Sequence, residues 1–357
     1  MFYFVIFILS VVSFLDLNKR KNLEIFYVVL LMIILVDGLR IETGTDWGTY
    51  KYFFELSIFN RFEIGYEIYI WVIKKIYNNY QFFVFIHAVI VDFLIYYSIF
   101  YISEYSFISI LLSYSLIESI LGSNRQLLAM GIVFFSFYLI YKKKKNFLGI
   151  IGLFVSILVH TSAIIIYPFF IFKKLIFNRK INLIFVLFIL FILKIFLKDM
   201  VIILTSNIFN NKELLERILP YLKKSFPYYK LLITLLKYVI LIFIANTLRN
   251  KKSNKDEKIN IFFLGSVYSL IITIFFWGVF QIVAGRGNYY TVVLFIFTNI
   301  GYNMKQSHDK KLKLYFILII IFYSFVTFER GIFGYRDLFV PYKGLIYNKN
   351  YIRERIY

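Results

Sequence analysis

Residues 40–67 read RIETGTDWGTYKYFFELSIFNRFEIGYE and form the longest polar interruption in the N-terminal part of the chain. Apolar blocks flank this stretch on both sides. Within it, two glycines enclose an aspartate (GTDWG, 44–48), and an aromatic run that suits a helix follows. A tether between membrane helices is normally short and plainly polar. The stretch is therefore predicted to be a folded, functional loop between two membrane-spanning blocks.

The composition places the rest of the chain in the membrane. It is 61% hydrophobic and 22% aromatic, with a mean hydropathy of +0.74. Several apolar runs approach the ~20 residues that a helix needs to cross a bilayer. We predict an all-α, polytopic integral membrane protein of about eleven or twelve transmembrane or re-entrant helices. Residues 1–357 are expected to form a single helical domain.

The charges fit this class. Lys and Arg number 41 against 20 Asp and Glu, and most cations fall in short clusters between apolar runs, as the positive-inside rule describes. This pattern argues against a nucleic-acid partner and suits anionic headgroups or an anionic lipid-linked substrate. The absence of cysteine excludes disulfides and a cysteine nucleophile. The opening MFYFVIFILSVVSFL has no basic segment before it, so it is predicted to be a membrane helix rather than a signal peptide.

Apolar runs and basic clusters together give a topology. The predicted membrane segments are roughly 2–16, 23–40, 81–101, 106–122, 126–141, 147–172, 181–204, 230–248, 259–282, 289–304 and 312–329.

The basic clusters all lie on the cytoplasmic side of the membrane only under two further assumptions about the chain. Residues 63–80 should form an amphipathic helix at the interface. Residues 147–172 should cross twice or dip and return, with a turn near His160. The outer face then gathers the loop 41–80 with its interfacial helix and a second loop, 205–229. It also gathers a turn at 285–288.

Four stretches in this order resemble one family of membrane proteins. They are GTDWGTYKYFF (44–54), EIGYEIYIWVIKKI (63–76), SNRQLLAMGIVFFSFYLIYKKKK (123–145) and FVSILVHTSAIIIYPFFIF (154–172). Together they resemble the EpsG family, which is loosely related to the bacterial Wzy-type polysaccharide polymerases. The resemblance is clear over roughly residues 30–175. Beyond them, AGRGNYY (284–290) and VPYK (340–343) are fainter matches.

The resemblance implies an activity and a location. Such a polymerase is a glycosyltransferase, with a GT-C-like membrane architecture possible. It joins oligosaccharide repeat units carried on undecaprenyl diphosphate into O-antigen, capsular or exopolysaccharide. The implied site is the outer, periplasmic face of the bacterial cytoplasmic membrane. The implied partners are the lipid-linked oligosaccharide, membrane lipid and a chain-length regulator.

That chemistry requires cations for the leaving diphosphate. Arg125 is the first candidate, because it opens a predicted helix whose N-terminus favours anions. The alternative is an arginine that only anchors the helix at the interface. Arg40 and Arg286 are further candidates, and each has a structural alternative, a helix-end anchor and a turn residue.

The acceptor hydroxyl needs a general base. Asp46 in GTDWG is the first candidate, although it also suits a helix cap. Glu63 and His160 follow, each matching the family's motifs; a histidine in an apolar run is otherwise more often structural. The predicted acceptor-binding residues are Trp47, Tyr50 and Gln126.

No cofactor is predicted, and no residues show clear metal-ligand spacing; Mg²⁺ held by a carboxylate and phosphate oxygens stays open. Asp92, Glu118 and Lys194 fall inside predicted membrane segments, where a charge costs about 2.5–3.5 kcal/mol. They suggest pairing of Lys194 with Asp92 or Glu118, or a proton-coupled transporter in which His87 takes part. A flippase for lipid-linked oligosaccharide is thus one alternative function, and a glycan ligase is another.

Overall fold

The computed structural model describes residues 1–18, 21–56, 61–177, 192, 228–247, 257–277, 281–306 and 309–353. Throughout these ranges the regular structure is helical, and the one β-type pairing described is an isolated antiparallel bridge between Arg40 and Gly344. The predicted all-α class is confirmed for this part of the chain. Lys194 and nearly all of the predicted loop 205–229 lie outside the described residues.

Two helical stretches are long and apolar enough to cross a membrane, Tyr80–Ile102 and Lys310–Leu338. Shorter apolar helices accompany them, at Phe2–Leu17, Ser106–Ile120, Asn146–Val159, Leu231–Thr247 and Ile261–Phe276. This composition is that of a membrane protein, and the number of crossings stays a prediction.

The chain divides into two compact units, which are described separately. Unit 1 consists of residues 1–163, 248–253 and 300–357, and unit 2 consists of residues 164–247 and 254–299.

Unit 1 contains most of the helices. They are α1 (Phe2–Ser13), η1 (Phe14–Asn18), α2 (Leu23–Gly38), α3 (Trp47–Leu56), α4 (Ile64–Ile76), α5 (Tyr80–Asp92), the π-helical turn η2 (Phe93–Tyr97), α6 (Ser98–Ile102), α7 (Ser106–Ile117), η3 (Glu118–Ile120), α8 (Asn124–Tyr141), α9 (Asn146–Val159), α17 (Lys310–Ile332) and η8 (Phe333–Leu338).

Polar caps explain where several of these helices begin. The side-chain oxygen of Asn22 accepts a hydrogen bond from the N–H of Ile25 at 3.0 Å, which caps α2. Asn79 caps α5 in the same way through the N–H of Phe82. Asp309 caps α17. Each cap satisfies a backbone donor that the first turn of the helix leaves without a partner.

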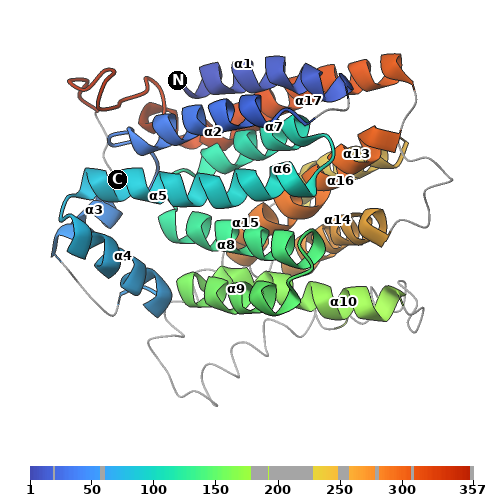
Figure 1. Ribbon diagram of the computed structural model, residues 1–357, viewed down its shortest axis with the longest axis horizontal. Coiled ribbons are helices and arrows are strands. Elements are labelled where there is room, and N and C mark those ends of the chain that lie inside the picture. Colours follow the sequence, from blue (N-terminus) through green and yellow to red (C-terminus); the bar gives the residue numbers. More distant parts are fainter. Residues whose placement is uncertain are drawn as a thin grey trace. The chain divides into compact units, whose positions relative to one another are not determined.

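Packing in unit 1 follows the apolar faces of its helices. α8 and α9 pack against each other, α2 packs along α5, and α7 contacts both α1 and α17 (Figure 1). The short helices α3 and α4 lie together at one end of the long helices of this unit (Figure 1). They form the folded loop that the sequence predicted between 41 and 80.

Helix α4 has two different sides. Tyr66 and Ile73 are buried, whereas other apolar side chains are exposed, namely Ile64, Ile68, Trp71, Val72 and Ile76. A helix with an exposed apolar stripe and terminal lysines suits a membrane interface. The interfacial location of α4 stays a prediction.

A C-terminal segment holds the loop that precedes α3. The N–H of Ile41 donates to the carbonyl of Lys343 at 2.8 Å, and the N–H of Leu345 donates to the carbonyl of Leu39 at 2.9 Å. The Arg353 guanidinium donates to the hydroxyl of Thr43 at 3.1 Å. Residues 339–353 therefore act as a clasp, a name we keep for this segment.

Unit 2 contains α10 (Tyr167–Phe177), α13 (Tyr228–Thr247), α14 (Glu257–Phe276), α15 (Gln281–Thr291) and the π-helical turn η7 (Val292–Phe297). The 3-10 helix η4 (Thr161–Ile166) and α16 (Thr298–Gln306) lie at its boundaries.

Aromatic contacts join the elements of unit 2. The rings of Phe169 and Phe295 are 4.4 Å apart, and the Tyr268 hydroxyl donates to the carbonyl of Ile165 at 2.5 Å.

The predicted turn at 285–288 is wrong, because α15 continues through these residues. Two glycines suggested a turn, but glycine weakens a helix by only about 1 kcal/mol relative to alanine. Contacts outweigh that preference here. The Thr273 hydroxyl of α14 bonds the side-chain oxygen of Asn288 at 2.8 Å, and α14 packs along α15.

Candidate functional site

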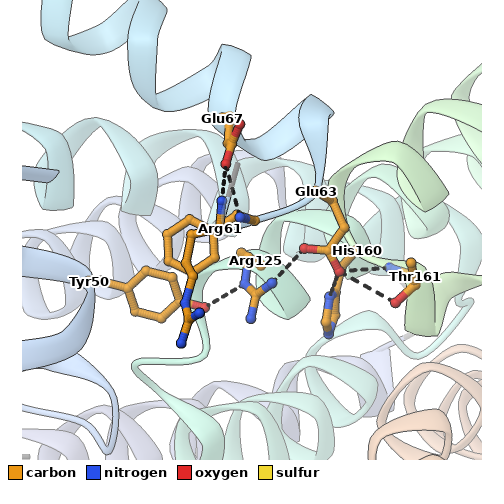
Figure 2. A network of polar contacts seen from close by, with 8 residues as sticks. Tyr50, Arg61, Glu63, Glu67, Arg125, His160 and Thr161 are labelled. Atoms are coloured by element: carbon orange, nitrogen blue, oxygen red, sulfur yellow. Dashed lines mark hydrogen bonds and ion pairs between the residues drawn. The ribbon is translucent and has the colours of Figure 1, made fainter. Parts of the chain in front are cut away.

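Five side chains meet where the short helices approach α8 and α9. They are Tyr50, Glu63, Arg125, His160 and Thr161, and we call them the Glu63 cluster (Figure 2). Tyr50 lies in α3, Glu63 precedes α4, Arg125 lies in the first turn of α8, and His160 follows the last residue of α9.

Glu63 occupies the cap position of α4 but does not cap it with its side chain. Its backbone carbonyl accepts the N–H groups of Tyr66 and Glu67, which begin the helix. The Glu67 carboxylate in turn accepts the N–H groups of Arg61 and Phe62, both at 2.9 Å. These bonds fix the turn before α4 and leave the carboxylate of Glu63 directed toward Arg125 and His160 (Figure 2).

A close backbone approach brings Glu63 to the end of α9. A Cβ atom on Gly65 would lie 2.7 Å from the carbonyl oxygen of Leu158 and 3.0 Å from the nitrogen of Val159. Only glycine permits α4 to contact the α9 backbone so closely. At the next residue, His160, the backbone becomes extended (φ −155°, ψ 121°), and its imidazole faces Glu63.

A second close approach places Arg125. Gly44 has φ +102°, and a Cβ there would lie 2.2 Å from the carbonyl oxygen of Leu121. The turn that starts α3 therefore packs directly on the turn that starts α8. This contact sets Tyr50 beside Arg125, whose Nε donates to the Tyr50 hydroxyl at 3.1 Å.

Both carboxylate oxygens of Glu63 are engaged. Oε2 accepts from the Arg125 guanidinium at 2.5 Å, and Oε1 lies 2.7 Å from Nδ1 of His160. Oε1 also accepts from the N–H of Thr161 at 3.2 Å. The side chains of Glu63 and Arg125 are 17% and 24% exposed and that of His160 is 6% exposed, so the cluster borders solvent. The Arg125 guanidinium also lies 4.5 Å from the ring centre of Phe62.

These contacts determine the charge of Glu63. Burial alone would raise its pKa, but the hydrogen bond from His160 and the positive charges of His160 and Arg125 outweigh burial and lower the pKa to about 2. Glu63 is therefore ionised at neutral pH and only accepts hydrogen bonds. The proton between it and His160 must then be on Nδ1, so a neutral His160 has its lone pair on Nε2.

The EpsG family model matches residues 23–343 and therefore includes every member of the Glu63 cluster. The chain belongs to the EpsG family. No curated protein and no solved structure matches the chain. EpsG membership confirms the resemblance in the sequence, and the match also includes the fainter stretches 284–290 and 340–343. Together with the apolar helices, it gives the chain a polymerase-like role in polysaccharide biosynthesis at a membrane.

Each of the four stretches that resemble EpsG contributes to the cluster, the fourth with both His160 and Thr161. Tyr50 comes from the first, Glu63 from the second, Arg125 from the third and His160 from the fourth. Motifs up to about a hundred residues apart thus meet at one place. The residues predicted as base, diphosphate ligand and acceptor contact therefore lie next to one another.

Other predicted site residues lie close to this cluster in the chain. Asp46 directly precedes α3, is half-buried, and its carbonyl accepts the N–H of Tyr50 at 3.0 Å. Trp47 is buried against Tyr80, with ring centres 5.1 Å apart. Gln126 is buried in the first turn of α8.

The other two predicted arginines are described separately. Arg40 is buried, donates to the carbonyl of Asp37 at 2.6 Å, and lies 5.9 Å from the ring of Trp47. Arg286 is exposed on α15 in unit 2. Arg125 is the predicted arginine whose hydrogen bonds place it in the Glu63 cluster.

Sequence reasoning did not assign a role to Gly65, Glu67 or Thr161. Gly65 and Glu67 lie in the second EpsG-like stretch, 63–76, but their roles depend on backbone contacts that the sequence of this stretch does not specify. Among the described residues, no three His, Asp or Glu side chains converge as a metal site requires.

Replacing Gly65 by alanine should separate Glu63 from His160. The new Cβ would meet backbone atoms of α9, which cannot move aside as a flexible side chain would. We expect a loss of about 1–3 kcal/mol in the free energy of unfolding and a drop of about 100-fold in polymer formation, since small misplacements of catalytic groups have such effects. The matched control is Gly334→Ala, whose Cβ would have no atom within 4 Å. Equal melting temperatures and polymer yields in the two variants would contradict this assignment.

The lowered pKa of Glu63 predicts a pH dependence of stability. A folded-state pKa of about 2, against the ordinary 4.5, means that ionised Glu63 stabilises the fold above about pH 4.5. That contribution should fall between about pH 4.5 and about pH 2 as Glu63 takes up a proton. The difference in melting temperature between the native protein and Glu63→Gln measures it. A difference that stays constant across this range would show that Glu63 is not held by these contacts.

Proposed function

We propose that this EpsG protein polymerises undecaprenyl-diphosphate-linked oligosaccharide repeat units into O-antigen, capsular or exopolysaccharide. The observation that supports it best is the Glu63 carboxylate, which bonds a histidine on one side and an arginine on the other. A transfer from a lipid diphosphate needs a base for the acceptor hydroxyl and a cation for the leaving group. In the cluster, the Glu63 carboxylate contacts a candidate base, His160, and a candidate cation, Arg125.

His160 is the proposed base. Glu63 holds Nδ1 with its proton, so Nε2 has the lone pair that accepts a proton from the acceptor hydroxyl. The same arrangement of carboxylate and imidazole orients the base in other enzymes. Glu63 itself is a weak base while its pKa is near 2, and its role here is to orient His160.

Arg125 is the proposed ligand of the diphosphate. Its guanidinium presents a planar fork that matches phosphate oxygens, and the N-terminus of α8 adds a partial positive charge. Since the side chain is partly exposed, a diphosphate can approach it beside Glu63. Binding would draw the positive charge of Arg125 from Glu63 toward the phosphates, which increases the negative charge that His160 experiences.

The proposed reaction is a single displacement at the anomeric carbon of the growing chain. The acceptor oxygen forms a bond to the anomeric carbon of the growing chain, and its proton moves to Nε2 of His160. The bond from that carbon to the diphosphate breaks, and undecaprenyl diphosphate leaves with the electron pair, stabilised by Arg125. Tyr50, Trp47 and Gln126 are proposed acceptor contacts, and Asp46 stays a second candidate base.

The location and partners are part of the same proposal. The cluster would face the outer side of the cytoplasmic membrane, with α4 at the interface and the polyprenyl tail between helices. A separate chain-length regulator would set the size of the product. The exposed apolar stripe of α4 supports an interfacial place for the helix that begins at Glu63.

Deleting the gene and resolving lipid-linked and surface glycans by size tests the proposal. Single repeat units at the surface without long chains are expected, since export continues while polymerisation stops. Loss of all surface units, with lipid-linked repeats kept inside, would show a transporter instead. Long chains that stay on the lipid carrier would show a ligase.

A further inference from the structure

The clasp contains a buried arginine. Arg353 is 5% exposed, whereas residues 345–352 directly before it are exposed. A charged side chain is seldom buried unless hydrogen bonds compensate for the water that it loses. The burial of Arg353 therefore marks the place where the clasp is fixed to the rest of unit 1.

Three oxygen atoms accept hydrogen bonds from the Arg353 guanidinium. Nη1 donates to the carbonyl of Asp337 in η8. Nη2 donates to the carbonyl of Pro341 and to the hydroxyl of Thr43, both at 3.1 Å. Asp337 and Pro341 lie where the chain enters the clasp, and Thr43 lies in the loop before α3. One side chain thus ties the end of the clasp both to its beginning and to that loop.

The loop before α3 is bonded to the clasp at three consecutive residues. The N–H of Ile41 donates to the carbonyl of Lys343 at 2.8 Å, and the ammonium of Lys343 bonds the Glu42 carboxylate at 2.5 Å. Thr43 is fully buried, and its hydroxyl donates to the carbonyl of Ile41 at 2.9 Å while it accepts from Arg353. The Thr43 hydroxyl therefore links the loop's own backbone to the clasp.

The next residues of the same loop contact the turn that starts α8. The N–H of Thr45 donates to the carbonyl of Leu121 at 3.3 Å, and Gly44 packs on the same carbonyl. Helix α8 begins three residues after Leu121 and has Arg125 in its first turn. The loop is thus held between the clasp and α8, so a displacement of the loop would move Tyr50 away from Arg125.

We infer that Arg353 and Thr43 are positioning residues of the polymerase. They act through the loop before α3, which sets Tyr50 beside Arg125, and not on the substrate. This inference rests on the proposed polymerase function. The part of the chain that matches the EpsG family ends at residue 343, so membership in the family does not by itself predict a role for Arg353.

The first test compares two substitutions of Thr43 in the purified full-length protein in detergent. Thr43→Val replaces the hydroxyl by a methyl group of nearly the same shape, and Thr43→Ser keeps the hydroxyl. With lipid-linked repeat units as substrate, Thr43→Val should lower kcat per folded molecule by about 10- to 100-fold, with a smaller change in KM, because small displacements of catalytic groups have such effects. Thr43→Ser should keep most of the native kcat.

A matched pair of cations in the clasp makes the same comparison from the other side of the bond. Arg353→Gln removes the buried guanidinium and should lower kcat as Thr43→Val does. Lys349→Gln removes an exposed cation from the same segment and should leave kcat unchanged. A lower melting temperature with an unchanged kcat per folded molecule, in both Thr43→Val and Arg353→Gln, would show a purely structural role and overturn the inference.

A second measurement does not depend on the polymerase reaction. The chain has no cysteine, so the variants Lys51→Cys and Phe147→Cys can be spin-labelled together at these two positions alone. Both positions are exposed, on α3 and on α9, which packs against α8. Below the melting temperature, Arg353→Gln should shift or broaden the distance between the two labels, and Lys349→Gln should not.

The two measurements separate the inference from the proposed function. A changed distance in Arg353→Gln, in a protein whose native form makes no polymer, would refute the polymerase and still show that the clasp places α3. An unchanged distance in Arg353→Gln would overturn the inference whatever the activity of the native protein.

Discussion

His160→Asn is expected to lower the rate of polymer formation by about 100-fold or more, which is the usual contribution of a general base. The asparagine amide can still donate to Glu63 from near the position of Nδ1, so the contact measured at 2.7 Å is largely kept. What the variant lacks is the lone pair on Nε2. The rate should be measured with purified protein and lipid-linked repeat units, following the length of the product.

A matched histidine separates chemistry from folding. His87→Asn changes a buried histidine that bonds Tyr69 and lies outside the Glu63 cluster. It should retain most of the polymerase activity in protein that has folded, as judged by the melting temperature. The rate of His160→Asn is compared with it at the same pH. An unchanged rate in that variant would remove His160 from the mechanism.

Arg125→Ala is expected to lower the rate by about 100- to 1,000-fold, the usual effect of losing a donor that stabilises developing negative charge. The side chain now bonds Glu63 at 2.5 Å and Tyr50 at 3.1 Å, and alanine removes both contacts. Arg125→Lys keeps the charge and loses the planar fork, so its rate should fall between those of alanine and the native residue.

Two comparisons show whether Arg125 acts on the substrate. Arg61→Ala removes an exposed arginine near the same turn, whose guanidinium lies 5.9 Å from the Phe53 ring, and should change the rate little. The double variant Arg125→Ala with Glu63→Gln should lose less than the sum of the single effects, because the two residues share one contact. Strict additivity would place Arg125 outside the site.

The sequence predicted the helices of unit 1 well, because a long apolar run is compatible with few structures other than an apolar helix. The expected segment 81–101 corresponds to the continuous stretch Tyr80–Ile102, and the expected break near His160 lies where α9 ends. The helical course of residues 285–288 was missed for the opposite reason. Local glycines gave a turn signal, while the contacts of α15 with α14 were not visible in the sequence.

The candidate site was predictable as a set of residues but not as an arrangement. Glu63, Arg125 and His160 were all named from separate motifs, with Asp46 placed ahead of Glu63 as the base. The ranking depends on which residues meet, and that is set by backbone approaches at Gly44 and Gly65. The burial of Arg40 beside Asp37 was not predictable from the sequence either, because it follows from how α2 packs on α5.

The clasp formed by residues 339–353 has a consequence for how the protein is made. The loop that starts α3 is tied to Lys343 and Arg353, which leave the ribosome about three hundred residues after it. While translation continues, the turn that sets Tyr50 beside Arg125 lacks these bonds. The support of the Glu63 cluster is then complete only once residues 339–353 have been made, so a copy that stops before them would lack the bonds that hold the loop before α3.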